Sequence, residues 1–252
     1  MNQRFSGKRA VITGAGSGIG KATVERFVSE GGYAIAVDIS QERLDKLSAE
    51  FHRRNQDLHI VCGDLSAAGT IEKIMSSVGS QLDILINNAG IMDDFIPLDE
   101  IDDEFWERVI AINLTAVMRL SRAALKVMLK QGHGVIVTTS SGASFKAGIA
   151  GTAYTTSKHG VNGLVKSIAA IYGDRGIRSN AVAPGGTKTN IMDLSKPIRG
   201  QQTLKQLAPN MSNATRTAQP SEVAASILYL ASDDASNVNG AILACDGGWS
   251  AK

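Results

Sequence analysis

The fold of this 252-residue chain is decided by the stretch TGAGSGIG, residues 13–20. A β-branched run at 9–13 leads into it and an amphipathic stretch follows, so the glycines join a strand to a helix. A turn of this kind brings backbone N–H groups and the helix N-terminus against a pyrophosphate, where side chains would obstruct the approach. Glycine triplets alone are more often just a tight turn, so a dinucleotide site needs support from other residues.

Asp38 gives the first support for a dinucleotide. It closes the next apolar run and lies 18 residues beyond Gly20. That is near the separation of about 20 at which a carboxylate holds the adenosine ribose hydroxyls. Its charge would repel a 2′-phosphate, so NAD is favoured as the cofactor and NADP is less favoured. The alternative is a surface aspartate before the helix predicted at 41–54, because Asp is common at helix starts.

Short β-branched runs alternate with longer stretches of helical period along the whole chain. The predicted strands lie at 9–13, 33–38, 59–62, 84–87, 134–139, 178–183 and 241–245. The predicted helices lie at 19–30, 41–54, 71–78, 102–130, 151–172 and 221–231. This order predicts an α/β fold, with one doubly wound Rossmann-type domain over residues 1–252 and a seven-stranded parallel sheet with helices on both faces. Ligands are then expected at the carboxyl edge of the strands.

Composition narrows the classes of partner. The 26 Lys and Arg residues nearly balance the 24 Asp and Glu residues, which argues against nucleic acid or an anionic membrane surface and favours a small molecule. No apolar stretch approaches 18 residues, so no membrane span is expected, and no metal site is predicted. Cys62 and Cys245 lie in runs typical of buried strands, and nothing resembles a secretory signal. We expect reduced core thiols and a cytoplasmic protein.

Tyr154 and Lys158 are the candidate chemical centre. They lie four residues apart in the helix predicted at 151–172, so their side chains point along one helix face. A nearby ammonium favours the phenolate and lowers the phenol pKa from about 10, which makes Tyr154 a candidate general acid/base. Such a pair, taken alone, is more often an interior tyrosine beside a surface lysine. His159 points about 100° away from Lys158 around the helix and is interpreted as structural.

Several further motifs occur in an order that is specific to one family. They are Asn87-Asn88-Ala89-Gly90, Asn113, Ser141, Pro184-Gly185 and Asp246-Gly247-Gly248. Together with the glycine turn and the Tyr154/Lys158 pair, they make the chain resemble a classical short-chain dehydrogenase/reductase over essentially its whole length. The resemblance implies an NAD-dependent oxidoreductase that interconverts a secondary alcohol and a ketone, with the cofactor carrying the hydride. The alternative is an NAD-binding sensor or scaffold without turnover, which would have no need for Asn113, Ser141, Tyr154 and Lys158 together.

The resemblance implies a role for each of these four residues. Tyr154 transfers the proton and Lys158 holds the nicotinamide ribose. Asn113 anchors a water in a proton relay, although neighbouring backbone could satisfy its amide instead. Ser141, 13 residues before Tyr154, binds the substrate oxygen. Because side chains alternate along a strand, only one of Ser140 and Ser141 should face the site.

The resemblance also implies a set of cofactor contacts. Asp64 resembles the family's adenine contact, with a solvated turn aspartate as the alternative. Thr187 and Thr189 resemble residues of the family's nicotinamide loop. The full set is Gly14, Ser17, Gly18, Ile19, Asp38, Asp64, Leu65, Asn88, Ala89, Gly90, Tyr154, Lys158, Pro184, Gly185, Thr187 and Thr189.

The segment at about 190–216 is predicted to be a substrate lid. It lacks strong periodicity and mixes apolar side chains, Met192, Leu194, Ile198, Leu204 and Leu207, with basic ones. Loops of this length are uncommon in compact domains and are often functional, with an ordinary surface loop as the alternative. Substrate contacts are predicted at Ser141, Ala143, Ile149, Tyr154 and Met192, with Phe145 and Met92 nearby. The substrate is expected to be a small-molecule alcohol or ketone.

The helices predicted at 102–130 and 151–172 carry more apolar positions than one sheet face needs to cover. In the resembled family these helices pair across a two-fold axis, and the segments at 221–231 and 241–245 form a second interface. The resemblance therefore implies a homotetramer with closed symmetry. The alternative is that both helices use their apolar faces on their own sheet.

Overall fold

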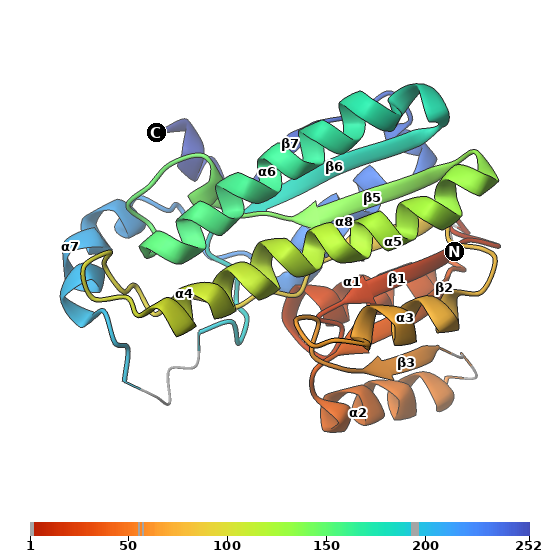
Figure 1. Cartoon of the computed structure of the whole chain (residues 1–252), viewed down its shortest axis with the longest axis horizontal. Coiled ribbons are helices and arrows are strands. Elements are labelled where there is room, and N and C mark those ends of the chain that lie inside the picture. The colour runs from red at the N-terminus through yellow and green to blue at the C-terminus, as the bar shows by residue number, and fades with distance from the viewer. Residues whose placement is uncertain (1–2, 55, 57, 193–196) are drawn as a thin grey trace.

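The computed structural model describes residues 3–54, 56, 58–192 and 197–252. Within them, seven parallel strands form one sheet in the order β3-β2-β1-β4-β5-β6-β7 (Figure 1). The strands are β1 (Arg9–Thr13), β2 (Tyr33–Asp38), β3 (His59–Cys62), β4 (Ile84–Asn87), β5 (Gly134–Thr139), β6 (Ile177–Pro184) and β7 (Ile242–Cys245). All seven predicted strands are confirmed, with ends shifted by at most one residue. The fold is the predicted doubly wound, Rossmann-like arrangement.

Helices cover both faces of this sheet (Figure 1). The longer ones are α1 (Gly18–Ser29), α2 (Gln41–His52), α3 (Thr70–Val78), α5 (Ala116–Gln131), α6 (Thr152–Tyr172) and α8 (Pro220–Ala231). Phe27, Leu47 and Ile227 bring α1, α2 and α8 into the core on one face. Ile74 and Ile168 bring α3 and α6 into the core on the other, together with α5. The strands are therefore buried between two helical layers, as their continuous apolar runs predict.

The connections set the place where a ligand can bind. The chain passes from β1 outward through β2 and β3, and then returns to β4 on the other side of β1. Ile12 of β1 pairs with Ile86 of β4 in this central position. Helices leave the sheet in opposite directions beyond the carboxyl ends of these two strands, which opens a crevice there.

The predicted helix at 102–130 is not one regular helix. It consists of α4 (Asp103–Ile110), a π-helical turn (Ala111–Thr115) and α5. Within the turn, Ala116 N donates to the oxygen of Ala111, five residues earlier. One inserted residue leaves the apolar pattern almost unchanged, so periodicity could not reveal it. π-helical turns are frequent at functional sites, and this one contains Asn113.

The predicted lid contains a helix that the sequence did not indicate, α7 (Gln201–Ser212). None of its residues is buried and Pro209 lies within it. Leu204, Leu207 and Met211 recur at helical spacing, but a proline inside a helix is unfavourable. Residues 193–196, and with them Leu194, lie outside the described residues.

Cys62 and Cys245 are reduced, as expected, but the expectation that they are core residues is wrong. β3 and β7 are the edge strands of the sheet and are only partly buried. Cys62 and Cys245 are accordingly half-buried free thiols and not core residues. Among the described residues, no helix is long and apolar enough to cross a membrane.

Candidate active site

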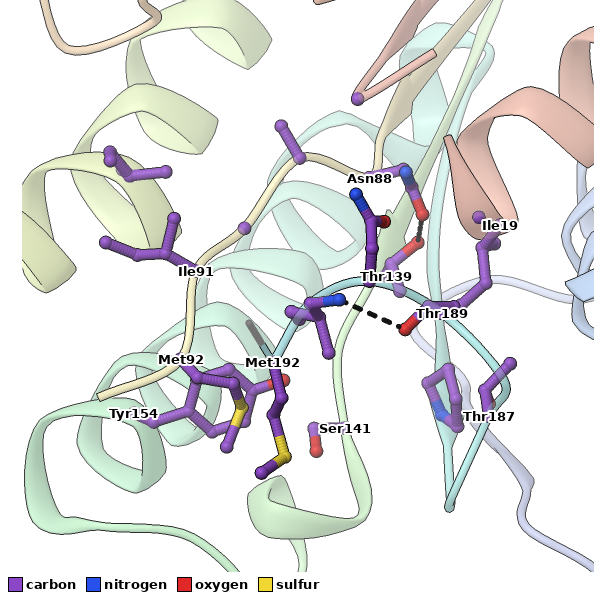
Figure 2. Close-up of a pocket in the computed structure, with 18 of the residues that line it drawn as sticks. Ile19, Asn88, Ile91, Met92, Thr139, Ser141, Tyr154, Thr187, Thr189 and Met192 are labelled. Atoms are coloured by element: carbon purple, nitrogen blue, oxygen red, sulfur yellow. Dashed lines mark hydrogen bonds between the residues drawn. The ribbon is translucent and has the colours of Figure 1, made fainter. Parts of the chain in front are cut away.

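A cavity of about 500 Å³ lies at the carboxyl ends of the strands. It extends from Asp38 and Asp64 at one end to Tyr154 and Trp249 at the other. All sixteen predicted cofactor contacts line it. Figure 2 shows Ile19 and Asn88 toward one side and Ser141, Tyr154, Met92 and Met192 toward the other.

The glycine turn forms one wall of this cavity. Gly14 has φ of 66°, in the left-handed region that favours glycine. A Cβ on Gly20 would collide with the carbonyl oxygen of Gly14. The side chain of Ser17 does not cap α1, so it leaves the first N–H groups of this helix unpaired. Close backbone approach and uncapped N–H groups fit the pyrophosphate of a dinucleotide.

The loop after β4 is tied to its neighbouring strands by side-chain hydrogen bonds. The Thr13 hydroxyl accepts from the backbone N–H groups of Asn88 and Ala89, at 2.9 and 3.1 Å. The Asn88 amide donates to the Thr13 carbonyl at 3.1 Å and accepts from Thr139 Oγ1 at 3.1 Å (Figure 2). Asn88 therefore joins β1, β4 and β5 at the floor of the cavity.

Asp38 is buried, with 6% of its surface exposed, so the alternative of a surface aspartate is wrong. Its oxygens accept from the backbone N–H groups of Gly16 and Ser40, both at 2.9 Å, and from the Arg43 guanidinium at 3.0 Å. Arg43 also lines the cavity. The carboxylate is therefore held in place by the glycine turn and the start of α2, with a cation beside it.

Asp64 lines the same end of the cavity and is not simply a solvated turn residue. It accepts from the Ser66 hydroxyl at 2.7 Å and from Arg108 at 2.8 Å. Burial raises the pKa of Asp64, but the hydrogen bonds from Ser66 and Arg108 outweigh it and hold the pKa below its usual value. Asp64 is therefore an ionised carboxylate fixed by α4.

Ser141, Tyr154 and Lys158 meet at the other end of the cavity. The side chains of Ser141 and Tyr154 both line this end, and that of Ser141 acts to lower the pKa of Tyr154. Lys158 Nζ lies 5.5 Å from the centre of the Tyr154 ring and donates to the Thr139 carbonyl at 2.9 Å. The Ser140 hydroxyl instead donates to Asn162 at 2.7 Å. The expected alternation of the two serines is confirmed, because the Ser140 hydroxyl is turned to Asn162 while the Ser141 side chain affects the pKa of Tyr154.

The expected direction of the Tyr154 pKa shift is wrong in this structure. Burial, reinforced by the charge of Asp93, raises the pKa of Tyr154 to about 12, although the Ser141 side chain acts in the opposite direction. Burial likewise lowers the pKa of Lys158 to about 8. Both groups lie at the bottom of the cavity, and Nζ lies over the ring while bonded to the Thr139 carbonyl. Desolvation therefore outweighs the attraction between ammonium and phenolate.

Residues 8–198 match the family model described as short chain dehydrogenase. The chain belongs to the short-chain dehydrogenase family. It is similar to 3beta-hydroxysteroid dehydrogenase 2 of Eggerthella lenta, with 41% identity over 99% of this chain and 97% of the relative. It is also similar to cis-4-hydroxycyclohexanecarboxylate dehydrogenase of Sinomonas cyclohexanicum, with 38% identity over 100% of both chains.

A solved structure shares the fold. It is that of a putative NAD(P) dependent gluconate 5-dehydrogenase from Beutenbergia cavernae with bound NADP, at a TM-score of 0.88, 32% identity and 100% coverage of both chains. Family membership and these relatives establish an oxidoreductase of alcohols and ketones with a nicotinamide cofactor. The glycine turn and the buried Asp38 of this structure fit such a cofactor.

Asn113 is the fourth residue to which the resemblance assigns a catalytic role. Its side chain does not line the cavity. Its side-chain oxygen accepts from Ile91 N, and its amide nitrogen donates to Ile91 O, both at 2.9 Å. The nitrogen also donates to Ser157 at 3.2 Å. The alternative of an amide satisfied largely by neighbouring backbone therefore describes this structure. Asn113 holds the loop after β4 against α6, which carries Lys158.

Asp93 is a residue of this site that the sequence analysis missed. It is fully buried and accepts from the backbone N–H groups of Tyr154 at 2.8 Å, Gly151 at 3.1 Å and Phe95 at 3.3 Å. Burial raises the pKa of Asp93 despite these hydrogen bonds. The only sequence signal is its place three residues after Gly90, in an irregular loop without periodicity. Asp93 fixes the N-terminus of the helix that carries Tyr154.

The substrate contacts were predicted only in part. Ile149, Met92 and Met192 line the cavity. Ala143 does not line it and is buried behind it, and Phe145 is exposed at the surface, so these two expectations are wrong. Lining residues that the sequence analysis did not name include Ile91, Phe95, Met211 and Trp249. Met211 and Trp249 come from α7 and the C-terminal turn, which only the fold brings to the site.

Proposed function

We propose that this protein interconverts a secondary alcohol and a ketone with NAD as the preferred cofactor and Tyr154 as the general acid/base. The observation that carries the proposal is that Ser141, Tyr154 and Lys158 line the same cavity as the uncapped glycine turn, with Lys158 Nζ 5.5 Å from the centre of the Tyr154 ring. When bound, NAD(H) supplies the hydride chemistry at the substrate carbon.

The residues of the chain supply the proton and the placement of the substrate oxygen. In the direction of reduction, Tyr154 is protonated at neutral pH because burial raises its pKa to about 12. Its hydroxyl gives its proton to the carbonyl oxygen as the carbon gains the hydride, and Ser141 donates a hydrogen bond to the same oxygen. The Lys158 ammonium stabilises the phenolate left behind. Oxidation of the alcohol runs through the same groups in reverse.

Asp38 supports the preference for NAD. A buried carboxylate that accepts two backbone N–H groups stays in place and repels a 2′-phosphate. Arg43 offsets part of this charge, so the preference depends on the balance of the pair. Asn113 and Asp93 are assigned positioning roles, because each binds the backbone of a segment that carries or contacts the reacting groups.

The relatives suggest a substrate in which the alcohol is on a ring. The Eggerthella lenta protein is named for a 3β-hydroxysteroid, and the Sinomonas cyclohexanicum protein for cis-4-hydroxycyclohexanecarboxylate. We extend the proposal to a ring alcohol, with the segment 190–216 as its lid. We also propose a homotetramer, supported by exposed apolar side chains on the segments expected at interfaces, namely Ile171 on α6, Tyr229 on α8 and Leu243 on the edge strand β7.

Turnover of ring alcohols and ketones, followed by NADH absorbance, tests the proposal. Tyr154→Phe should lower kcat by about 10³-fold, while its NADH affinity stays within about twofold of the parent's. Tyr172→Phe is the matched control, because Tyr172 lies at the end of the same helix and does not line the cavity. It should keep parental turnover. Comparable activity in the Tyr154 variant would remove Tyr154 as the acid/base.

A further inference from the structure

The substrate end of the cavity is apolar. Its wall includes Met92, Phe95, Ile149, Met192, Met211 and Trp249. Figure 2 shows Met92 and Met192 at the end of the cavity where Ser141 and Tyr154 lie. Ile149 and Trp249 also pack in one cluster with Tyr154, with Met92 and Met211 against it. A substrate oxygen held by Ser141 therefore places the rest of the substrate against thioethers, aliphatic groups and aromatic rings.

Most of the charged side chains that line the cavity form ion pairs with one another. Of the described residues, five that line it carry a charge. Asp38 and Arg43 form one pair and Asp64 and Arg108 another, at 3.0 and 2.8 Å, both at the opposite end from Tyr154. Lys158 is the fifth and donates to the Thr139 carbonyl. Arg43 and Arg108 therefore each have a carboxylate partner at the far end of the cavity, and Lys158 has one donor bonded to a backbone carbonyl.

The wall around Trp249 has its polar atoms satisfied internally. The indole N–H donates to the Asn210 carbonyl at 3.0 Å, and the Asn210 amide donates to the Gly148 carbonyl at 3.2 Å. Lys146 lies 5.5 Å from the Trp249 ring and donates to the Trp249 carbonyl at 3.4 Å. The C-terminal turn, α7 and the loop before α6 thus form one connected wall among the described residues, in which the indole N–H and the Asn210 amide are already bonded to backbone carbonyls.

We propose that the substrate is a neutral, fused-ring alicyclic alcohol or its ketone. This inference rests on the proposed function and narrows it. An anionic group buried against this wall would lose its hydration without gaining a partner, which is strongly unfavourable. Methionine side chains adapt to an irregular rigid outline, and the large rings of Phe95 and Trp249 provide flat apolar area. Additional ring surface beyond the reacting carbon should therefore strengthen substrate binding, and a charged group on the substrate should weaken it.

Three ketones test this with the parent enzyme and NADH: cyclohexanone, 2-decalone and 4-oxocyclohexanecarboxylate. The second ring of 2-decalone should raise kcat/KM at least about tenfold over cyclohexanone. The carboxylate should lower it at least about tenfold. A carboxylate ketone that is used as well as cyclohexanone, or a decalone that is used no better, overturns the inference.

A charge placed in the wall tests whether this wall faces the substrate. Met211→Arg should raise the kcat/KM ratio of 4-oxocyclohexanecarboxylate to cyclohexanone at least about tenfold, because the new cation pairs with the carboxylate. Gln206→Arg adds the same charge to the exposed side of the same helix, α7, and should leave the ratio unchanged. Equal ratios in the two variants contradict the proposed location.

Binding without turnover separates this inference from the proposed function. Calorimetry on the Tyr154→Phe variant with saturating NADH should show tighter binding of 2-decalone than of 4-oxocyclohexanecarboxylate. If the parent reduces none of the ketones but this order of binding holds, the oxidoreductase proposal fails. The inference that the site prefers neutral fused-ring compounds is then still supported. If the parent reduces the ketones but binding follows the opposite order, only the substrate class is wrong.

Discussion

Replacing Asp93 by Asn tests whether this buried carboxylate positions the catalytic helix. The shape of the side chain is kept, but one oxygen becomes an NH₂ group that cannot accept a hydrogen bond. Either the Tyr154 N–H or the pair from Gly151 and Phe95 then loses its acceptor. Asp93→Asn removes a defined set of contacts without emptying the space.

The expected loss of stability follows from these contacts. A hydrogen bond to a charged group contributes about 1.5–3 kcal/mol, and leaving a buried N–H unpaired costs a similar amount. Removing the charge also relieves the desolvation that raises the pKa of Asp93, so the two effects partly cancel. We expect a net destabilisation of about 2 kcal/mol, or roughly 4–8 °C in Tm for a chain of this size.

The pH profile separates a role at Tyr154 from a purely structural one. The negative charge of Asp93 helps to raise the pKa of Tyr154, so its removal should lower that pKa. Alcohol oxidation needs the phenolate, and the acid limb of kcat should therefore move to lower pH. The assay is kcat for oxidation with saturating NAD across pH, beside thermal unfolding. Asp99→Asn, an exposed change in the same loop, is the control and should move neither. An unchanged Tm and acid limb in Asp93→Asn would refute the reasoning.

Three further predictions follow from the site and the surface. Asp38→Ala should reduce the ratio of kcat/KM with NAD to that with NADP at least about tenfold by removing the repulsive charge, and a parent enzyme that prefers NADP would show this assignment to be wrong. Because binding favours the protonated amine and the free-enzyme pKa of Lys158 is about 8, NADH affinity measured by fluorescence should fall as pH rises through about 8. Lys158→Ala should abolish this dependence, and a flat parental profile counts against the role of the ammonium. Light scattering at micromolar concentration should report a tetramer that loses activity on dilution before it loses its circular dichroism, whereas a fully active monomer would remove the assembly proposal.

The sheet and the nucleotide end of the cavity were predictable because their signals are local. Each strand is a short apolar run, and the turns after β1 and β2 are marked by the glycines and by Asp38. Parallel strands bring their carboxyl ends to one edge, so residues far apart in sequence could be placed together without knowing side-chain contacts. The alternation of Ser140 and Ser141 followed from strand geometry in the same way.

The missed features depend on tertiary packing. Helix α7 has no buried residue and contains Pro209, and the π-helical turn at Asn113 adds a single residue to an otherwise regular pattern. Asp93 and Trp249 lie in irregular segments that only the fold brings to Tyr154. The direction of the Tyr154 pKa shift depends on how deeply the side chain is buried, and the sequence spacing between Tyr154 and Lys158 gives no information about burial.

Transfer of deuterium from NADH deuterated at the nicotinamide C4 to a ring ketone tests the central claim most directly. The account predicts that mass spectrometry of the alcohol product finds one deuterium, on the carbon that carried the carbonyl, from one of the two C4 positions. Tyr154→Phe should form this product about 10³-fold more slowly under the same conditions. An alcohol product without deuterium from either position, or no alcohol product from any ring ketone in the presence of bound NADH, would contradict the account.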